Sequence, residues 1–421
     1  MSSKKKTAAT KEDGNPALVP KLRFPEFQDD WEMTPIGEKV DLLSGYPFDG
    51  PDICEDRSGV RLLRGINITE GRIRHSPEID RYYTGETDGL EKFRVCLNDL
   101  VIGMDGSKVG KNSSLISDDD ADALLIQRVA RLRTSSPTLI QFIFQQINST
   151  TFHSYVDKIN TSSGIPHISA KQIKEFTVGF PSPPEQQKIA ECLSSVDELM
   201  AAQARKVDAL KTHKKGLMQQ LFPREGETQP RLRFPEFQDA GEWEVKSVGD
   251  VFKVTRGEVL SMTLVKDETS SEAPYPVYSS QTKNKGLAGY YSEYLYQDAI
   301  TWTTDGANAG DVNFRPGRFY CTNVCGVLIN TDGQANVCIA ALLNSVTRGH
   351  VSYVGNPKLM NGVMAKIEIP FPSIEEQQRI ADCLTSLDAL ITAETQKLDA
   401  LKTHKKGLMQ QLFPCPEEIE S

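Results

Sequence analysis

The chain lacks any long apolar run. No stretch of about 18 consecutive apolar residues occurs in its 421 residues, so the sequence predicts no membrane-spanning helix. The N-terminal residues MSSKKKTAATKEDGNP are polar and basic and lack the apolar segment of a secretory signal. We therefore expect a cytoplasmic protein and interpret residues 1–20 as a disordered tail, whose lysines could also contact nucleic acid.

The spacing of the cysteines indicates no disulfide framework. The chain has eight of them, and Cys321 and Cys325 stand four positions apart without a second Cys/His pair to complete a zinc site. Cys192 and Cys383 occupy equivalent positions in two predicted helices, where small buried thiols fit better than disulfides. We expect reduced thiols and no metal site.

Catalytic motifs are also missing. The segment GSKVGK at 106–111 is similar to a P-loop, but Asp105 stands where that pattern requires glycine and Asn112 where it requires serine or threonine. The chain has no Asn-Pro-Pro-aromatic tetrapeptide of the kind that amino-methyltransferases use, and no repeated histidine or carboxylate group suited to hydrolysis. We therefore expect a non-catalytic chain that holds no cofactor of its own.

What the chain does have is repetition. Residues 180–223 and 371–414 are identical at 31 of 44 positions, and both end in DALKTHKKGLMQQLFP. An octapeptide, LRFPEFQD, precedes each of these segments, at 22–29 and at 232–239. The offsets are 191 and 210, so two modules share their ends and differ in their middles. This pattern predicts an internal pseudo-twofold repeat, in which one scaffold carries two different recognition domains.

The shared ends predict two long helices, at 181–223 and 372–414. Their apolar residues recur with alternating spacings of three and four, which is the heptad period of helices that pair. At 1.5 Å per residue each helix would span roughly 55 Å, and Pro223 and Pro414 would end them. The alternative is an amphipathic helix that packs only on its own domain. We favour a coiled coil between the two helices, which would fix the distance between the variable domains.

Each helix has ten seam positions, of which eight are apolar. The apolar seam residues are Ile189, Leu193, Val196, Met200, Val207, Leu210, Leu217 and Leu221 in the first helix, and Ile380, Leu384, Leu387, Ile391, Leu398, Leu401, Leu408 and Leu412 in the second. The polar breaks fall at equivalent places, Gln203 and Lys214 in one helix and Glu394 and Lys405 in the other. Polar seam residues lower stability but fix register and partner number.

The segments between the shared ends predict two mixed α/β (α+β) domains. We place them at 21–180 and 243–371, with a linker at 224–242 and a tail at 415–421. Runs of β-branched and aromatic residues predict strands, and two apolar stretches predict short helices. The predicted strands are Val60–Leu63, Leu100–Gly103, Leu124–Leu132, Ala299–Thr303 and Asn323–Ile329, and the predicted short helices are Leu139–Ile147 and Ala335–Leu343.

One local pattern occurs in both middles. MDGSKVG at 104–110 and TDGANAG at 304–310 each contain D-G-x-x-x-G after an apolar run. Two glycines this close permit left-handed backbone and a close approach to another surface. The pattern predicts either a structural hairpin turn or a loop that approaches DNA.

Basic and amide side chains in both middles are candidates for DNA contact, since Arg and Asn can read base edges and Lys more often binds phosphate. The net charge of −9 argues against a wholly basic surface but not against a local footprint. The candidates in the first domain are Arg64, Arg72, Arg74, Asp105, Ser107, Lys108, Lys111, Arg128, Arg131, Arg133, His167 and Lys171. Those in the second domain are Arg256, Lys283, Asn284, Lys285, Thr304, Asn308, Arg315 and Lys358.

Two of these groups carry specific expectations. Arg128, Arg131 and Arg133 alternate along a predicted strand and are expected on one face of it. His167 and Lys171 precede the first long helix and could face DNA or simply close a loop. For every charged cluster, the alternative is an ordinary solvated surface.

Taken together, these motifs resemble the specificity (S) subunit of type I DNA restriction–modification systems. The resemblance covers nearly all of 22–414. It rests on LRFPEF before each variable domain, on FPSPPEQQKIAECL and FPSIEEQQRIADCL after them, and on the terminal LKTHKKGLMQQLF. The first domain adds LLRGINITEGRI, NDLVIGMDGSKVGK and LLIQRVARLR.

The resemblance implies a mechanism. Two target recognition domains would each read one half of a split double-stranded DNA site, and the long helices would pack antiparallel and set the gap between the halves. Two modification subunits would bring S-adenosylmethionine and methylate adenine. Two restriction subunits would add translocation and cleavage driven by ATP with Mg, and no membrane would be involved.

Two alternatives stay open. One is a DNA-binding or scaffold subunit of another phage-defence complex that uses the same architecture without methylation. The other is a structural coiled-coil adaptor that makes no DNA contact. The clustered Arg and Asn residues of the variable domains argue against the adaptor.

Overall fold

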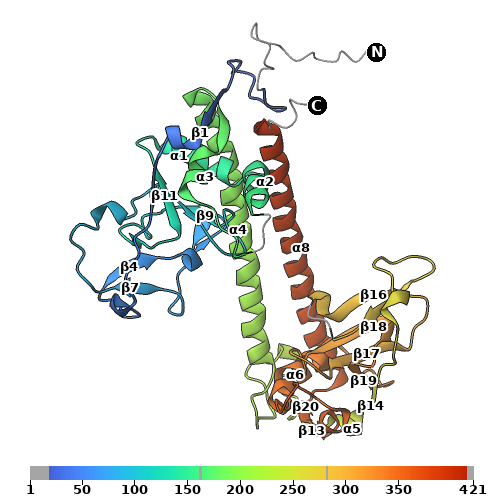
Figure 1. Ribbon diagram of the computed structural model, residues 1–421. Coiled ribbons are helices and arrows are strands. Elements are labelled where there is room, and N and C mark those ends of the chain that lie inside the picture. The colour runs from blue at the N-terminus through green and yellow to red at the C-terminus, as the bar shows by residue number, and fades with distance from the viewer. Residues whose placement is uncertain (1–18, 161–163, 281–282, 415–421) are drawn as a thin grey trace, which may run out of the picture. The chain divides into compact units, whose positions relative to one another are not determined.

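The computed structural model describes residues 19–160, 164–280 and 283–414, without the side chain of Lys283 (Figure 1). The chain divides into two compact units. Unit 1 holds the residues up to Gln203 and those from Lys397 onward, and unit 2 holds Ala204–Gln396. Each unit therefore contains one variable domain and parts of both long helices. Apart from Val19 and Pro20, the predicted tails at 1–20 and 415–421 lie outside the described residues.

The two long helices are confirmed. They are α4 (Pro183–Leu221) and α8 (Ile374–Leu412), each of 39 residues and each within two residues of its predicted bounds. Both end two residues before a proline, which has no N–H with which to continue the helix. In unit 1 the first part of α4 lies beside the last part of α8, and in unit 2 the roles are exchanged (Figure 1).

Side chains of the predicted seams join the two helices. Every seam position is buried or half-buried. The lysines that interrupt the apolar pattern bind the opposite helix: Lys405 Nζ lies 2.7 and 2.8 Å from the carboxylate oxygens of Asp197, and Lys214 Nζ lies 2.6 Å from that of Asp388. Because each contact joins the start of one helix to the end of the other, the two helices run in opposite directions within each unit.

Unit 1 contains small sheets and three short helices. Its strands are β1 (Glu32–Pro35), β2 (Asp41–Ser44), β3 (Ile53–Cys54), β4 (Val60–Leu63), β5 (Ile68–Thr69), β6 (Arg72–Ile73), β7 (Arg81–Tyr83), β8 (Leu100–Gly103), β9 (Ser113–Leu115), β10 (Leu124–Leu125), β11 (Val129–Arg133) and β12 (Thr177–Phe180). They form sheets of order β10–β4–β7–β3 and β2–β11–β8–β9 and the ribbons β1–β12 and β5–β6. The helices are α1 (Pro137–Ile147), α2 (Thr150–Ile159) and α3 (Ala170–Glu175).

Unit 2 repeats part of this plan. Its strands are β13 (Glu244–Ser247), β14 (Lys253–Arg256), β15 (Tyr275–Tyr278), β16 (Leu287–Tyr291), β17 (Tyr296–Thr303), β18 (Val312–Cys321), β19 (Cys325–Ile329) and β20 (Glu368–Phe371). The ribbon β13–β20 matches β1–β12, and the sheet β14–β19–β17–β18 matches β2–β11–β8–β9, with β15 and β16 added. The helices are α5 (Val248–Val251), α6 (Val337–Val346) and α7 (Asn361–Met364).

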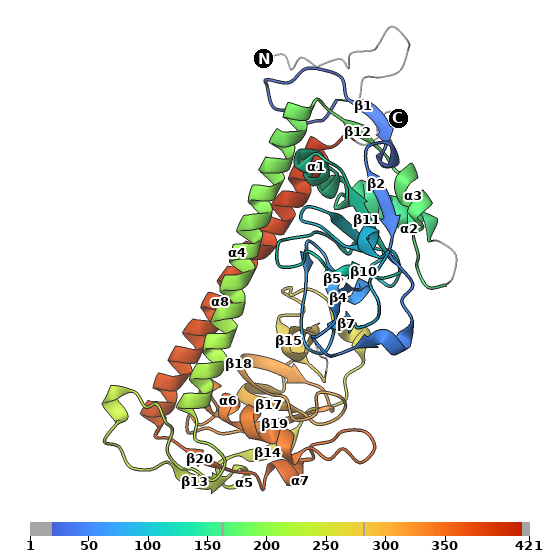
Figure 2. The same ribbon diagram turned by 90° about the vertical axis from the view of Figure 1, so that its left-hand side faces the viewer.

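The matching ribbons attach each domain to its own long helix. β1 pairs antiparallel with β12, and β12 leads directly into α4 (Figure 2). Glu32 stands opposite Phe180, and in unit 2 Glu244 stands opposite Phe371 in the same register. The start of each variable domain is therefore paired with its end, at the point where the shared helix begins.

Most predicted elements agree with these bounds. β4 and β8 have the predicted ends, and β17 and β19 contain most of the predicted residues. α1 covers the predicted helix Leu139–Ile147, and α6 begins two residues after the start predicted for the second short helix. The single strand predicted at Leu124–Leu132 is wrong. A turn at Gln127–Arg128 divides it into β10 and β11, and Arg128 there has a left-handed φ of 67°.

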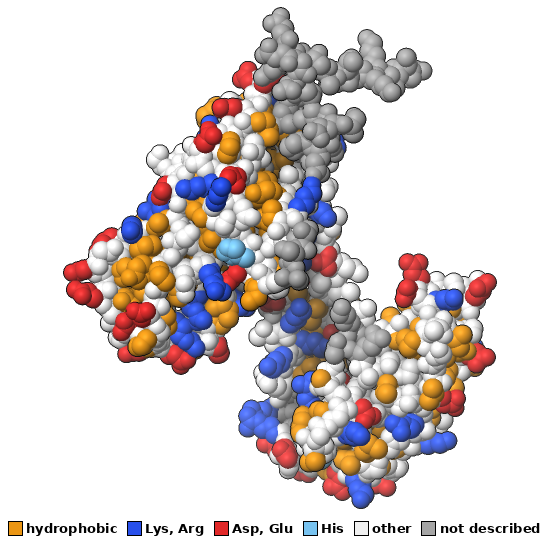
Figure 3. Space-filling model, in the orientation of Figure 1, with side chains coloured by type: hydrophobic (Ala, Val, Ile, Leu, Met, Phe, Trp, Pro, Cys, Tyr) orange, Lys and Arg blue, Asp and Glu red, His pale blue; other side chains and the backbone are white. Residues whose placement is uncertain are grey.

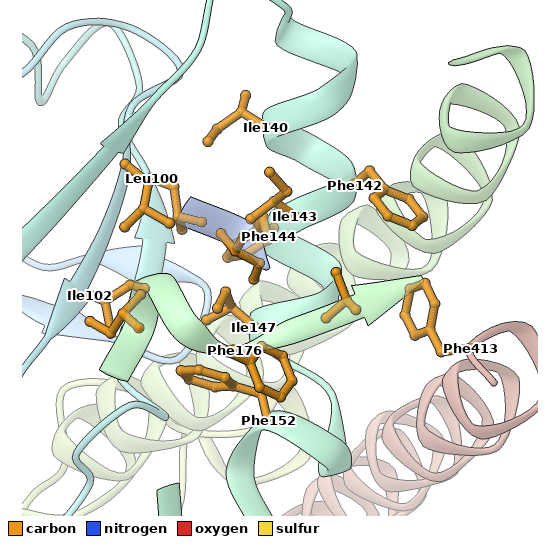
Figure 4. Close-up of a cluster of buried hydrophobic side chains, with 14 of the residues drawn as sticks. Leu100, Ile102, Ile140, Phe142, Ile143, Phe144, Ile147, Phe152, Phe176 and Phe413 are labelled. Atoms are coloured by element: carbon orange, nitrogen blue, oxygen red, sulfur yellow. The ribbon is translucent and has the colours of Figure 1, made fainter. Parts of the chain in front are cut away.

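The core of unit 1 joins the variable domain to both helices. Ile140, Ile143 and Ile147 follow one face of α1, near Leu100 and Ile102 of β8 (Figure 4). On the other side of α1, the ring of Phe142 meets that of Phe413, with centroids 5.8 Å apart. Because Phe413 follows the end of α8, the first variable domain and the end of the second long helix share one core.

The repeated octapeptide binds the start of a long helix in each unit. Arg23 donates two hydrogen bonds of 2.8 Å to Glu185 in unit 1, and Arg233 donates two of 2.7 Å to Glu376 in unit 2. Both carboxylates are 1% exposed at the start of a long helix. These hydrogen bonds raise the pKa of both guanidiniums. We call the two pairs the Arg–Glu clamps.

The same octapeptide also holds the end of the opposite helix. The N–H of Leu22 donates to the carbonyl of Gln411 near the end of α8, and that of Leu232 donates to Gln220 near the end of α4. LRFPEF thus joins the start of one helix to the end of the other. This is why the motif and both helix ends repeat together.

Within the described ranges, no helix has the length and hydropathy needed to cross a membrane. The seven cysteines that the structure describes are free thiols. Among the same residues there is no cluster of three His, Cys, Asp or Glu side chains suited to a metal ion.

Candidate nucleic-acid interface

The D-G-x-x-x-G segment of unit 1 forms a tight loop after β8. The N–H groups of Val109 and Gly110 donate to the carbonyls of Gly106 and Gly103, both at 3.1 Å. Gly106 and Gly110 have φ values of 92° and 71°, a region that side chains disfavour. A Cβ at Gly110 would also lie 2.8 Å from Val156 of α2. Both glycines are therefore required by the loop itself.

Unit 2 contains the same loop after β17. Ala309 and Gly310 donate to Gly306 and Thr303, both at 2.9 Å, and the two glycines have φ values of 93° and 90°. The structural turn is thus confirmed in both units. That these loops approach DNA stays a prediction.

A second loop is bonded to each of the first. In unit 1, Gly106 donates to the carbonyl of Pro166, and Ile168 donates to that of Met104. In unit 2, Gly306 donates to Pro357 and Leu359 donates to Thr304, with distances of 2.9 Å. Each unit therefore presents a pair of cross-bonded loops, which we call the double loop: residues 104–110 with 164–168, and 304–310 with 355–359.

Sequence reasoning missed the second repeat behind this geometry. Gly164-Ile-Pro166 and Gly355-Asn-Pro357 are related by the same offset of 191 as the long helices. A search for short matches at that offset would have found the G-x-P pattern. His167 and Lys358 occupy equivalent places in it, and their backbones bridge to Asp105 and Asp305.

Ion pairs surround the double loop of unit 1. Lys108 lies 2.9 Å from Glu70, Lys111 lies 3.4 Å from Asp157 and Arg128 lies 3.0 Å from Asp105. Lys108 and Arg128 are well exposed, as is Ser107. Exposed ion pairs of this kind are weak, so their cations can exchange partners.

A buried histidine lies next to Lys111. His153 is on α2, and its Nε2 atom is buried without a hydrogen-bond partner among the described residues. Burial lowers the pKa of His153, and the charge of Lys111 lowers it further. The imidazole is therefore neutral near pH 7, and His153 adds no positive charge at this place.

Fewer cations surround the double loop of unit 2. Lys358 lies 3.8 Å from Asp305, and Arg348 lies 2.9 Å from Asp311, just after the loop. Asn308 is half-buried. The side chain of Thr304 is buried and its hydroxyl donates to the carbonyl of Val324 or to Asp305, which contradicts its predicted DNA contact.

The arginines of β11 do not form the predicted DNA-binding face. Arg131 is 3% exposed and its guanidinium pairs with Asp41. Arg133 donates to both oxygens of Asp99, at 2.7 and 2.6 Å. Arg131 and Arg133 therefore hold the sheet together, whereas Arg128 lies in the turn before it. Burial lowers the pKa of Arg131. The hydrogen bonds that Arg133 donates to Asp99 raise the pKa of Arg133.

Arg315 is likewise wrong as a DNA contact. It is 7% exposed, its guanidinium lies 3.8 Å from the ring centre of Tyr278, and it donates to Thr301 and to the carbonyl of Lys285. Burial lowers the pKa of Arg315. Of the other candidates in this domain, Arg256, Asn284 and Lys285 are exposed, and the side chain of Lys283 lies outside the described part of the structure.

The remaining candidates of unit 1 fall into two groups. Arg64 and Arg74 donate to the backbone carbonyls of Ile79 and Ile66, whereas Arg72 is exposed on β6. Lys171 is 83% exposed on α3, 3.6 Å from Glu175. His167 is exposed, and its N–H donates to Asn160, which supports the loop-closing alternative.

A histidine fixes the segment that carries Arg72 and Arg74. The ring nitrogens of His75 lie 2.9 Å from Asp80 and 2.8 Å from Asp120. Asn67, which is fully buried, donates to the same oxygen of Asp80. This arrangement holds a basic segment in place near Glu70, the partner of Lys108.

Charged side chains of both signs are interspersed on the face shown in Figure 3. Neither variable domain presents a wholly basic surface in this view. A DNA footprint on this face would therefore have to be local.

Comparison with known proteins gives the family. A model of the type I restriction modification DNA specificity domain matches residues 73–212 and 240–403. A Mycoplasma pneumoniae protein named as a type I specificity subunit is 30% identical over 256 residues, or 59% of this chain and 90% of that protein. The protein named as the MjaX type I restriction enzyme specificity subunit of Methanocaldococcus jannaschii is 22% identical over 93% of this chain and 95% of its own length.

Solved structures agree on the fold. The crystal structure of the S subunit of a type I restriction–modification system from M. genitalium superposes with a TM-score of 0.61. It is 17% identical in sequence, and the match covers 94% of this chain and 99% of that one. With two matched domains and the same fold over almost its whole length, the chain belongs to the family of type I restriction–modification DNA specificity subunits.

Proposed function

We propose that this specificity subunit reads a split double-stranded DNA site, one half with each variable domain. The observation that carries the proposal is the double loop, which occurs once in each unit with the same backbone hydrogen bonds and different side chains. A fixed backbone with exchanged side chains suits two domains that perform the same task on different sequences. Cations beside each loop can position the DNA backbone, while side chains on the loops read base edges.

The long helices act as a spacer in this proposal. The buried seams and the paired Lys405–Asp197 and Lys214–Asp388 contacts support an antiparallel coiled coil. Such a coiled coil would set the number of base pairs between the half-sites. One heptad inserted into both helices would add about 10 Å, or about three base pairs, to the gap.

Partner subunits dock on the outward faces of the helices. Ser195, Leu199 and Ala202 of α4 are exposed, and Ser386, Leu390 and Ala393 repeat the same residues on α8. Leu199 and Leu390 are 58% and 41% exposed. An identical exposed row on both helices suits two copies of one partner. We assign these surfaces to modification subunits, which would supply S-adenosylmethionine and the methylation chemistry.

Restriction subunits complete the proposed assembly. They would bring the ATP- and Mg-dependent steps, and this chain would direct chemistry that its partners perform. Membership of the specificity-subunit family supports the proposal that restriction subunits take part. The neighbouring genes distinguish it from another phage-defence complex with the same architecture.

Single-molecule methylation sequencing tests the proposal. DNA is taken from a host that expresses this chain with its neighbouring modification subunit. The expected result is N6-methyladenine in a motif of two short half-sites around a fixed gap. If the complex assembles and no such motif appears, the methylation proposal is contradicted and binding without methylation is favoured. The heptad insertion then tests the spacer, and an unchanged gap would contradict it.

A further inference from the structure

The double loops divide into constant and variable positions. In both units the positions that shape the backbone are occupied by the same kind of residue: the two loop glycines, the proline of G-x-P and the apolar residue two positions after it, Ile168 or Leu359. Val109 and Ala309, just before the second glycine, are both 6% exposed and point into the unit. These positions are fixed by packing and by the hydrogen bonds that join the loops.

Besides His167 and Lys358, whose backbones join the two loops, three exposed or half-buried positions of the double loops differ between the units. They are the two residues after Asp-Gly in the first loop and the residue between Gly and Pro in the second. In unit 1 they are Ser107, Lys108 and Ile165, and in unit 2 they are Ala307, Asn308 and Asn356. All are exposed except Asn308, which is half-buried. Ile165 is 77% exposed.

We propose that these three positions determine which bases each domain reads. The inference rests on the proposed function and deepens it, because it assigns specificity to particular side chains. The same backbone would hold each side chain at the same place relative to DNA in both half-sites. A change of side chain on an unchanged backbone would then change the base and not the docking geometry.

The side chains suit different bases. Asn308 and Asn356 each offer one amide, which can bond two edge atoms of an adenine. Lys108 can donate to guanine, and Ile165 can contact the methyl group of thymine. Lys108 is held by Glu70 at 2.9 Å, but both side chains are exposed, so DNA can replace the carboxylate at little cost.

The neighbouring charges fit this role. Asp105 and Asp305 stand at the same place in the two loops, and each pairs with a cation, Arg128 or Lys358. These acidic residues hold the loop beside a positive charge that can face a phosphate. The constant Asp therefore belongs to the frame, and the discriminating contacts are left to the three variable positions.

The test exchanges the three residues between the units. One variant carries Ser107→Ala, Lys108→Asn and Ile165→Asn, and the other carries Ala307→Ser, Asn308→Lys and Asn356→Ile. Each is expressed with the modification subunit, and the methylated motif is sequenced. The expected result is a changed or relaxed base preference, on the order of tenfold to a hundredfold at one or two base pairs, in the altered domain's half-site only. The other half-site and the gap should stay the same.

Controls separate this inference from the proposed function. Leu97→Asn removes a 50% exposed apolar residue outside the double loop and should leave both half-sites unchanged. If the unaltered complex methylates a split motif and both exchange variants methylate it identically, the assignment of specificity is overturned while the proposed function stands. If the unaltered complex methylates no split motif, both are overturned.

If a variant assembles but methylates nothing, a DNA-binding measurement tests the assignment of specificity. The purified complex is titrated with the original site and with sites that carry single base-pair changes in the affected half. Equal binding to the original and changed sites supports the assignment. A preference as strong as that of the unaltered complex contradicts it.

Discussion

The two units anchor equivalent loops with ion pairs of opposite polarity. In unit 1 the residue after the second loop glycine is Lys111, which pairs with Asp157 at 3.4 Å. In unit 2 the same place holds Asp311, which pairs with Arg348 at 2.9 Å. Asp157 and Arg348 each stand seven residues before the glycine of G-x-P. Since the signs are reversed and the contact is kept, the pair joins the segment after the first loop to the segment that precedes the second.

A positive charge beside a double loop is not enough to indicate a DNA contact. Lys111 is a basic residue beside a candidate DNA-facing loop, yet its counterpart is an aspartate, which repels phosphate. A role shared by both units therefore cannot depend on the lysine. The units agree in backbone and anchoring, and differ in side chains that face outward.

The largest difference between the units is expected at the Arg–Glu clamps. In unit 2 the indole N–H of Trp243 also donates to Glu376, at 3.1 Å, whereas the equivalent nitrogen of Trp31 is buried without a hydrogen-bond partner among the described residues. Glu376→Ala would remove the carboxylate partner of both Arg233 and Trp243, whereas Glu185→Ala would remove that of Arg23 alone. Arg233 would keep only its hydrogen bonds to the carbonyls of Ala240 and Gly241. We expect losses of about 3–5 kcal/mol in each unit, larger for Glu376→Ala.

Hydrogen exchange of the full chain measures this prediction, because it reports on each unit separately. Faster exchange should appear in the ribbon and helix start of the altered unit. Equal effects of the two substitutions would contradict the idea that the clamp of unit 2 is the more fully bonded.

Replacing each tryptophan by phenylalanine isolates the extra hydrogen bond. Trp243→Phe should lower the free energy of unfolding by about 1–2 kcal/mol more than Trp31→Phe, because a buried carboxylate loses a donor only in unit 2. Urea denaturation of both variants gives the comparison. Equal losses would mean that packing of the ring, and not the N–H, decides the effect.

Charge exchange at the loop anchor gives a smaller effect. Lys111→Asp should destabilise unit 1 by roughly 0.5–1 kcal/mol, because it faces Asp157, and adding Asp157→Arg should restore most of the loss. The double variant reproduces the polarity of unit 2. A double-mutant cycle in thermal denaturation measures the coupling, and additive effects would show that the pair contributes nothing.

The smallest expected effect concerns nonspecific DNA binding. Glu70→Gln frees Lys108 and should raise the affinity for nonspecific duplex DNA about twofold to fivefold, with a steeper salt dependence. Asp332→Asn, at an exposed turn of unit 2 away from its double loop, is the control for the change in net charge. An equal gain in the control would assign the effect to total charge and not to the loop.

The sequence predicts the long helices well because their pattern is local. Seam residues recur every three or four positions, so the period of one helix contains the information, and every seam position is in fact buried or half-buried. The polar breaks were also informative, since Lys214 and Lys405 pair with the opposite helix. In these helices, residues that lie together on one face also recur at regular intervals in the sequence.

The arginines of the variable domains could not be placed in this way. Arg131 and Asp41 are 90 positions apart, and Arg133 and Asp99 are 34 apart, so only the order of the strands brings them together. Arg315 is buried by a tyrosine from another strand. An arginine on a strand looks the same in sequence whether a carboxylate or a phosphate will meet it.

The core of unit 1 has a consequence for biosynthesis. Phe413, which packs on Phe142, follows every residue of unit 2 in the sequence, so the first unit lacks part of its interior until all of unit 2 has been made. Domains usually complete their folding in the order in which the ribosome releases them. Here the second unit, whose segments all precede Lys397, can be finished first, and the earliest part of the chain to be synthesised is the last to close.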